Sequence, residues 1–199
     1  MLSAESNKML RKTLSQDSSF DSNFYKDRLD WTGKFINESL SIIESNYSRF
    51  PTRNRWNCNC HAIHDNDYDA LMIDYSFLRK EYTKVCKKFC SKNGYELVGL
   101  SDIWYNYYKT GQYQEPHNHL GKVSINQMRP EFKLFTAVHY MIFDNEHHSV
   151  TQFCDPNIIV PKVDWADIIF FPATWMHYVT ENTSNFPRLT TAFTFQVRK

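Results

Sequence analysis

Hydrophobic residues in the first half of the chain recur at helical spacing in two segments. In residues 32–47 the apolar positions are Ile36, Leu40, Ile43 and Tyr47. In residues 74–93 they are Leu78, Tyr82, Val85 and Phe89. Intervals of three and four residues place each set on one side of a helix, and Thr32 and Asn93-Gly94 supply a start and a stop. The pattern predicts two amphipathic helices, each of which needs an apolar surface to pack on.

The hydrophobic period changes after residue 94. Short stretches rich in β-branched and aromatic residues follow, separated by turn residues: 95–109, 133–143, 149–154, 157–160, 167–172, 176–182 and 189–197. Several short strands at this spacing are typical of an antiparallel sandwich or barrel. We therefore predict a mainly β fold with α-helices, a jelly-roll barrel buttressed by N-terminal helices. Residues 1–94 would form a polar tail and the supporting helices, and residues 95–199 the barrel core of one compact unit.

Two polar segments lie outside these predicted elements. The first twenty or so residues are rich in serine and asparagine, so we expect them to be loosely ordered. Residues 51–69 show neither a helical nor a strand period and are predicted to form an irregular connection.

Charge and cysteine content narrow the classes of function. The chain has 199 residues, a formal net charge of +1 and five cysteines. Because a nearly neutral chain has no strong attraction to nucleic acid or acidic membranes, we expect neither as a partner. No apolar run reaches membrane-spanning length, and the N-terminus lacks the apolar core of a signal peptide. The irregular, odd set of cysteines is unlike a secreted disulfide framework, which favours the cytoplasm. Oligomeric state has no signal in the sequence.

Three histidines form the first candidate site. His117 and His119 are two residues apart, and on a strand such residues project from the same face. His177 lies near the start of another predicted strand, so the three imidazoles can converge on one ion. Neutral imidazole suits iron, copper, zinc and nickel alike. The alternative is that these are ordinary polar residues of the barrel.

Arg188 strengthens the case for a ligand-binding barrel. It follows His177 by eleven residues and precedes Thr190 on the last predicted strand. The planar guanidinium binds a carboxylate through two parallel hydrogen bonds. An arginine directed into a barrel beside a metal would therefore hold the far carboxylate of a dicarboxylic co-substrate. The alternative is a surface arginine that begins an edge strand.

Several spaced motifs resemble the 2-oxoglutarate/Fe(II) oxygenase superfamily, in its prolyl-hydroxylase-like branch, and are similar to oxygenases of bacteria and their phages. They are W-x-N-x-Y-x-x-G-x-x-Q-x-x-H-x-H from Trp104 to His119, a strand like AVHYMIF, then F-x-D-P, and DIIFFP-x-x-x-x-H-x-V. In this chain the matching residues, besides the histidines, are Trp104, Asn106, Tyr108, Gly111, Gln114, Phe153, Asp155, Pro156, Phe171, Pro172 and Val179. The resemblance spans residues 102–197, about half of the chain.

The resemblance implies a double-stranded β-helix and a role for each matching residue. His117 and His177 would bind Fe(II), and Arg188 would bind the 5-carboxylate of 2-oxoglutarate with Thr190 as a hydroxyl partner. The co-substrate pocket would also be lined by Asn106, Tyr108 and Tyr140, although either Tyr140 or its neighbour His139 could point inward.

The activity implied is hydroxylation of a substrate with O2, which converts 2-oxoglutarate to succinate and CO2. The substrate would be a peptide or protein side chain, or a small molecule. The alternative is a cupin-like protein that binds a metal and a small carboxylate without turnover.

His119 departs from the family pattern, because most members have an acid at this position. Three interpretations remain open. His119 ligates the metal in place of the acid, or it turns away and Asp155 or Glu115 supplies a carboxylate, or the site holds another metal or supports no turnover. A histidine, unlike an acid, cancels none of the charge of the ion.

Two further histidine-containing segments are set aside. Cys58, Cys60, His61 and His64 form a C-x-C-H-x-x-H cluster. Its spacing differs from that of structural zinc sites, so a polar loop near the substrate entrance is the favoured interpretation. The pair His147-His148 lies in a turn-like segment and is predicted to be solvated.

Overall fold

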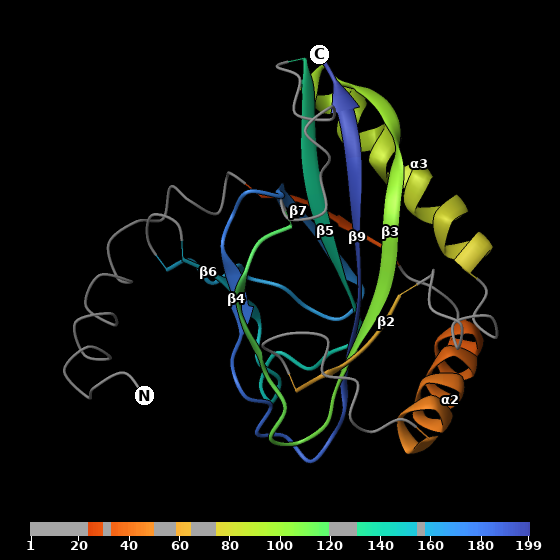
Figure 1. The fold of residues 1–199 in the computed structure, drawn as a ribbon, viewed down its shortest axis with the longest axis vertical. Coiled ribbons are helices and arrows are strands. Elements are labelled where there is room, and N and C mark those ends of the chain that lie inside the picture. The colour runs from red at the N-terminus through yellow and green to blue at the C-terminus, as the bar shows by residue number, and fades with distance from the viewer. Residues whose placement is uncertain (1–23, 30–32, 50–58, 65–74, 120–130, 155–157) are drawn as a thin grey trace.

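The computed structural model describes residues 24–29, 33–49, 59–64, 75–119, 131–154 and 158–199. In this part of the chain, two helices precede most of the strands (Figure 1). Helix α2 spans Gly33–Arg49 and helix α3 spans Tyr75–Asn93, so both predicted helices are confirmed. Helix α3 stops at Gly94, whose φ of 68° is easily adopted by glycine, as the sequence predicts. The predicted cap Thr32 lies outside the described residues. No helix of the described part is long and apolar enough to cross a membrane.

The strands form two antiparallel sheets. The large sheet has the order β1-β7-β5-β9-β3-β2, and the small sheet the order β4-β8-β6. In the large sheet the strands are β1 (Tyr25–Arg28), β7 (Asp167–Pro172), β5 (Phe132–Ile142), β9 (Arg188–Arg198), β3 (Glu96–Tyr108) and β2 (His61–His64). In the small sheet they are β4 (Gln114–His117), β8 (His177–Val179) and β6 (Thr151–Phe153).

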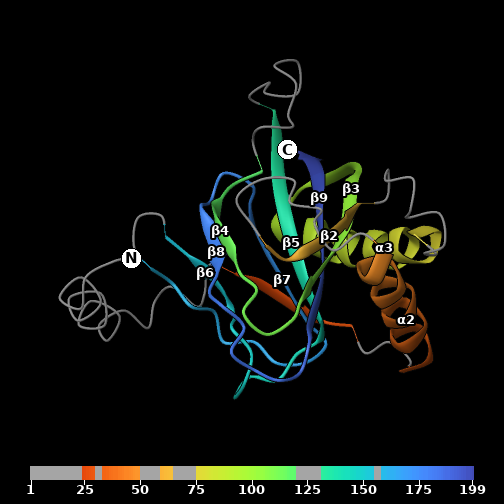
Figure 2. The ribbon, with the colours of Figure 1, turned by 60° about the horizontal axis from the view of Figure 1, so that its bottom comes forward.

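The large sheet lies between the small sheet and the helices (Figures 1 and 2). The face toward helices α2 and α3 is called the outer face here, and the face toward the small sheet the inner face. The outer face packs on the helices through a large apolar cluster that includes Leu78, Tyr82, Phe89, Leu189, Phe193 and Phe195. The inner face contributes Trp104, Val138, Phe171 and Ala192 to a smaller cluster, which also includes Phe153 of the small sheet. This arrangement confirms the predicted jelly-roll with helices packed on one sheet.

Three segments differ from the prediction. Residues 61–64, predicted as irregular, form strand β2, which pairs with β3 along the edge of the large sheet. The predicted element list did not include β1, which pairs with β7 at the opposite edge. Conversely, the predicted strand at 157–160 is reduced to an isolated bridge between Ile159 and Phe153 in its described residues. Pro161, which has no backbone N–H, lies two residues after Ile159.

Both edges of the large sheet therefore come from the N-terminal half of the chain. Strands β1 and β2 precede residue 94, the proposed boundary between supporting region and barrel core. The support from residues 1–94 thus includes backbone pairing as well as helix packing. The boundary at residue 94 stays an interpretation.

Candidate functional site

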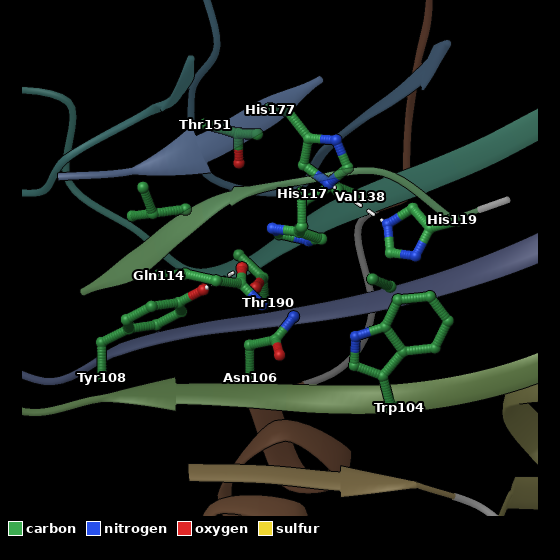
Figure 3. Close-up of a pocket in the computed structure, with 12 residues that line it drawn as sticks. Trp104, Asn106, Tyr108, Gln114, His117, His119, Val138, Thr151, His177 and Thr190 are labelled. Atoms are coloured by element: carbon green, nitrogen blue, oxygen red, sulfur yellow. Dashed lines mark hydrogen bonds between the residues drawn. The ribbon is translucent and has the colours of Figure 1, made fainter. Parts of the chain in front are cut away.

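Three histidines meet where the small sheet faces the large one. His117, the last residue of β4, lies opposite His177, the first residue of β8. The Nε2 atoms of His119 and His177 are 3.2 Å apart, and one ring nitrogen from each of the three histidines lies within 4.8 Å of the others. Figure 3 shows the imidazoles directed toward one another above Trp104 and Asn106. Among the described residues this is the group of histidine, cysteine and acidic side chains that could hold a metal ion.

Backbone carbonyls orient two of the rings in the same way. The Nδ1 atom of His117 lies 2.8 Å from the carbonyl oxygen of Glu115, and that of His177 lies 3.0 Å from the carbonyl oxygen of Trp175. A carbonyl oxygen can only accept, so each Nδ1 carries the proton and each Nε2 keeps a lone pair. This is how partners of metal-ligating histidines commonly fix the tautomer.

Burial keeps these imidazoles in the neutral form that binds metals. Loss of solvation lowers the pKa of His117 below its ordinary value. The pKa of His177 falls to about 3, chiefly through burial and secondarily through repulsion from a charged His117. Both side chains are therefore deprotonated at neutral pH and ready to donate a nitrogen lone pair.

His119 reaches the cluster by a route that the sequence did not predict. Strand β4 ends at His117, so the two residues do not share a regular strand. Instead, the backbone N–H of His119 donates to the carbonyl of Ala173 at 3.0 Å, and its ring packs 5.1 Å from that of Trp104. Of the carboxylates weighed as alternatives, Glu115 is not part of the cluster, and Asp155 lies outside the described residues.

Arg188, the first residue of β9, is completely buried. The alternative of a surface arginine is therefore wrong. Its Nη2 donates to the hydroxyl of Thr151 at 3.3 Å, while Nε and Nη1 have no hydrogen-bond partner among the described residues. The guanidinium carbon lies 4.6 Å from the ring centre of Tyr108 and 5.5 Å from that of Tyr140. Within the described part of the chain, no carboxylate balances its charge.

A pocket joins the histidine cluster to the surroundings of Arg188 (Figure 3). Its walls combine the three histidines with uncharged side chains: Trp104, Asn106, Tyr108, Gln114, Val138, Thr151, Val179, Thr190 and Ala192. The register of the large sheet explains this gathering, because Tyr108 lies opposite Arg188 and Asn106 opposite Thr190. Gln114 accepts a hydrogen bond from the Tyr108 hydroxyl at 2.9 Å.

The structure also decides between the neighbours on strand β5. Tyr140 lies on the inner face beside Arg188. His139 lies on the outer face, where its ring contacts the Tyr82 hydroxyl at 3.1 Å and the Leu29 carbonyl at 3.3 Å. The Tyr140 hydroxyl is buried near Thr151 and Arg188, and among the described residues it makes no hydrogen bond of good geometry. Burial raises its pKa, and the nearby charge of Arg188 opposes that rise.

Most of the sequence-predicted site residues are thus brought together, and one contributor was missed. Asn106, Tyr108, Tyr140, Arg188 and Thr190 line or adjoin one pocket with the histidines. Thr151, which touches Arg188, was missed because a lone threonine in a short strand carries no distinctive pattern.

The C-x-C-H-x-x-H segment yields no metal group in its described part. Cys60 and His61 are buried at the start of β2. Neither belongs to a metal-binding cluster of described residues. Cys58 and the side chain of His64 lie outside the described part.

Comparison with known proteins agrees with the geometry. Residues 102–194 match the sequence profile of the family described as "Putative 2OG-Fe(II) oxygenase". A search of curated proteins gave no match.

Solved structures share the fold at low sequence identity. The viral collagen prolyl hydroxylase of Paramecium Bursaria Chlorella virus-1 aligns with a TM-score of 0.56 at 15% identity, covering 89% of this chain and 97% of that one. A Trichoplax adhaerens prolyl hydroxylase, in complex with a hypoxia inducible factor peptide fragment, aligns at 0.54 and 11% identity, covering 98% and 94%. The alpha-ketoglutarate-dependent carbocyclase SnoK of nogalamycin biosynthesis aligns at 0.65 and 10% identity, covering 98% and 84%. At these identities the likeness shows the fold.

The family match and the shared fold cover the segment that carries the histidine cluster, the pocket and Arg188. Residues 102–194 of this chain are thus similar to a 2-oxoglutarate/Fe(II) oxygenase family, and the chain shares the fold of prolyl hydroxylases.

Proposed function

We propose that this protein hydroxylates its substrate, with Fe(II) bound by His117, His119 and His177 and 2-oxoglutarate bound by Arg188. When both are bound, they would activate O2 to oxidise a substrate C–H bond while 2-oxoglutarate is converted to succinate and CO2. The observation that carries the proposal is the buried guanidinium of Arg188, two of whose donor atoms have no partner among the described residues, in the same barrel as a three-histidine cluster.

The residues present suit both groups. Three neutral imidazoles with converging nitrogens provide donors that bind iron(II), although zinc, copper or nickel would accept the same donors. The preference for iron therefore comes from the family match. The pocket lining is predominantly uncharged, and Arg188, which contacts Thr151 and Tyr108 of that lining, is the available anion receptor.

Arg188 would bind the distal carboxylate of the co-substrate. An unpaired charge in a protein interior is costly, and a carboxylate placed against the guanidinium fork removes that cost through strong hydrogen bonds. The hydroxyl groups of Thr151, Thr190 and Tyr140 surround this end of the pocket. Among the described residues the Oδ1 atom of Asn106 has no partner and the Tyr140 hydroxyl has no hydrogen bond of good geometry, so the pocket has further unused hydrogen-bonding capacity.

Aromatic side chains would keep water away from the reacting centre. The ring of Phe171 lies 4.9 Å and that of Phe153 5.8 Å from the His177 ring, and Trp104 covers His119. Their apolar surfaces reduce the access of solvent to the place where the metal would bind. These ring contacts support a shielding role, and the same rings also pack the protein core.

His119 would give the centre an unusual charge. In most relatives an acid ligand offsets one charge of iron(II), whereas a neutral histidine offsets none. The co-substrate dianion would then be the principal balance for the ion, and the iron would be more electron-poor. This expectation depends on His119 occupying the ligand position, which its Nε2 contact of 3.2 Å with His177 supports.

A peptide or protein side chain is the substrate class that we propose. Two structural neighbours are described as a collagen prolyl hydroxylase and a prolyl hydroxylase in complex with a peptide fragment. These descriptions support the class by analogy of fold.

Anaerobic titration of the Fe(II)-loaded protein with 2-oxoglutarate tests the proposal. Binding of 2-oxoglutarate at the iron should produce a weak visible metal-to-ligand charge-transfer band that saturates with co-substrate. Arg188→Ala should weaken saturation strongly, whereas Arg198→Ala, at the exposed end of the same strand, should not. Absence of the band, or equal affinity in wild type and Arg188→Ala, would contradict the co-substrate assignment. A normal band without succinate formation, across candidate substrates, would favour the cupin-like alternative.

A further inference from the structure

The carbonyl oxygen of Phe186 receives two side-chain hydrogen bonds just before Arg188. His148 contacts it through Nε2 at 3.2 Å, and Asn182 donates to it through Nδ2 at 3.2 Å. Both side chains are buried, with 7% and 0% exposure, whereas the Phe186 residue itself is 70% exposed. We call residues 182–187 the arginine loop. The end of this loop is therefore held by hydrogen bonds to the carbonyl oxygen of Phe186 and not by burial of the Phe186 ring.

His148 can serve as a donor to this loop only in one tautomer. Its Nδ1 accepts the backbone N–H of Asp144 at 3.0 Å, so the proton lies on Nε2 and is donated to the Phe186 carbonyl. The prediction of a solvated His147-His148 pair is therefore correct for His147, which is exposed beside Asp144, and wrong for His148. His148 joins the turn before β6 to the arginine loop.

Asn182 links the same carbonyl to strand β3. Its Nδ2 also donates to the carbonyl of Tyr108 at 3.2 Å. Tyr108 is the residue opposite Arg188 in the sheet, and its ring covers the guanidinium. The backbone of Asn182 further exchanges hydrogen bonds with Gly111 and Gln112, in the segment that leads to the histidine strand.

The position of the Phe186 carbonyl is transmitted to Arg188 through Pro187. A proline has a fixed φ and no backbone N–H, so Pro187 restricts the turn between the anchored carbonyl and the arginine. A second route runs through ring contacts. His148 packs on Phe143 at 5.9 Å, Phe143 on Tyr140 at 4.8 Å, and Tyr140 lies beside the guanidinium.

We propose that His148 and Asn182 are positioning residues for Arg188, and that they set the affinity for 2-oxoglutarate by fixing the Phe186 carbonyl. This inference rests on the proposed function, because the direction of the guanidinium matters only if Arg188 binds 2-oxoglutarate. A bidentate carboxylate contact depends on the angle of the guanidinium plane, so small rotations at the start of β9 weaken it. The metal ligands lie on β4 and β8 and just beyond β4, so their affinity for iron should depend little on this anchor.

Two substitutions of His148 separate its two hydrogen bonds. In His148→Gln the amide nitrogen can reach the place of Nε2 and still donate to the Phe186 carbonyl. In His148→Asn the shorter amide can replace Nδ1 as acceptor for Asp144 but cannot reach Phe186. We expect His148→Asn to raise the Kd for 2-oxoglutarate about five- to tenfold, in line with the loss of one buried hydrogen bond. His148→Gln should stay within about twofold of wild type, as should the matched exposed control His147→Gln.

The measurements are the Kd for Fe(II) and the Kd for 2-oxoglutarate, the latter from the anaerobic charge-transfer titration. A positioning role changes the second constant and leaves the first unchanged. Equal weakening of both constants in His148→Asn would indicate a merely structural role and overturn the inference. So would an unchanged Kd for 2-oxoglutarate in His148→Asn.

Pro187→Gly provides an independent test if His148→Asn does not fold. It removes no buried polar group and loosens the connection between the Phe186 carbonyl and Arg188. We expect a several-fold weaker affinity for 2-oxoglutarate with unchanged Fe(II) affinity; unchanged affinity for both would contradict the inference. Failure of the proposed function is distinguishable, because in that case Arg188→Ala itself would leave 2-oxoglutarate binding unchanged.

Discussion

Both faces of the large sheet bury polar side chains. On the outer face the side chains compared below have hydrogen-bond partners within the protein, whereas on the inner face they retain atoms without partners among the described residues. On the outer face His139 contacts Tyr82 and the Leu29 carbonyl. Tyr105 and Tyr107 also donate from this face, to Ser39 and Glu44 of helix α2. On the inner face the guanidinium of Arg188, the hydroxyl of Tyr140 and the amide oxygen of Asn106 retain buried atoms without partners in the described part.

This difference arises between adjacent residues of the same strands. His139 and Tyr140 follow one another on β5, and Arg188 and Leu189 on β9. Because alternate residues face opposite ways, each strand presents one set of side chains to the helices and the other to the pocket. Native proteins rarely leave buried polar atoms unpaired without a reason. The outer-face side chains compared here are thus satisfied within the protein, whereas on the inner face we expect a ligand to supply the missing partners.

Adjacent substitutions on β9 should separate the two faces most strongly. Leu189→Ala, on the outer face, should lower the unfolding free energy by about 2–5 kcal/mol, because it leaves a cavity against the helices. Arg188→Met should leave the stability of the ligand-free protein unchanged or raise it by about 1–4 kcal/mol, because it removes an uncompensated buried charge. The same change should weaken 2-oxoglutarate binding by about 100-fold or more.

Denaturant unfolding of the metal-free proteins and co-substrate titration of the Fe(II) forms provide the two measurements. Folded Leu189→Ala should bind 2-oxoglutarate as wild type does. A large loss of stability in Arg188→Met would show that the protein itself satisfies the guanidinium, and the comparison between the faces would fail.

Substitution of His119 tests which side chains bind the metal on the inner face. His119→Ala should weaken Fe(II) binding by about 10- to 100-fold, because one of three converging nitrogens is lost. His119→Asp should retain the metal, because a carboxylate is also a good ligand for Fe(II). Metal competition titrations measure both constants. Full iron affinity in His119→Ala would show that another group, such as Asp155, supplies the third ligand.

An outer-face histidine provides the contrast to that result. His139→Leu should lower the unfolding free energy by about 1–3 kcal/mol, because the Tyr82 hydroxyl loses a buried partner. Fe(II) and 2-oxoglutarate affinities of the folded variant should match those of wild type. Chemical unfolding combined with metal titration measures both effects, and a weakened metal affinity would show that the two faces are coupled through the sheet.

Periodicity in the sequence predicted the helices and the order of most strands, but not the edges of the large sheet. Helices α2 and α3 have clear apolar stripes, and such a stripe depends only on the residues of the helix itself. Strands β1 and β2 are four residues long, and their pairing depends on the exposed edges of β7 and β3. Tertiary pairing of this kind overrides local pattern, so a polar segment such as residues 61–64 becomes a strand.

For the candidate site, the ligand types were predictable and the side-chain directions were not. His117 and His177 stand out by spacing and family pattern, and the structure brings them together. The choice between His139 and Tyr140 could not be made from the sequence, because a strand buried on both faces lacks the polar and apolar alternation that marks its direction. The burial of His148 depends on the arginine loop, which is distant in the sequence.

Acid should weaken both faces, and the largest contribution on each comes from one deeply buried histidine. Burial lowers the pKa of His139 and of His177 to about 3 in the folded chain, against an ordinary value of 6.5. Between pH 6.5 and 3 the unfolded chain therefore binds more protons than the folded chain, and the unfolding free energy falls as the pH falls. Each histidine contributes a slope of at most about 1.4 kcal/mol per pH unit. Denaturant unfolding of the metal-free protein at pH 7.5, 6.5, 5.5 and 4.5 measures the total slope. His139→Leu should remove the outer contribution and His177→Gln the inner one, while the exposed-histidine variant His147→Gln should retain both. If only His177→Gln reduces the slope, the outer histidine is already solvated, and the view that the outer-face side chains are satisfied within the protein is wrong.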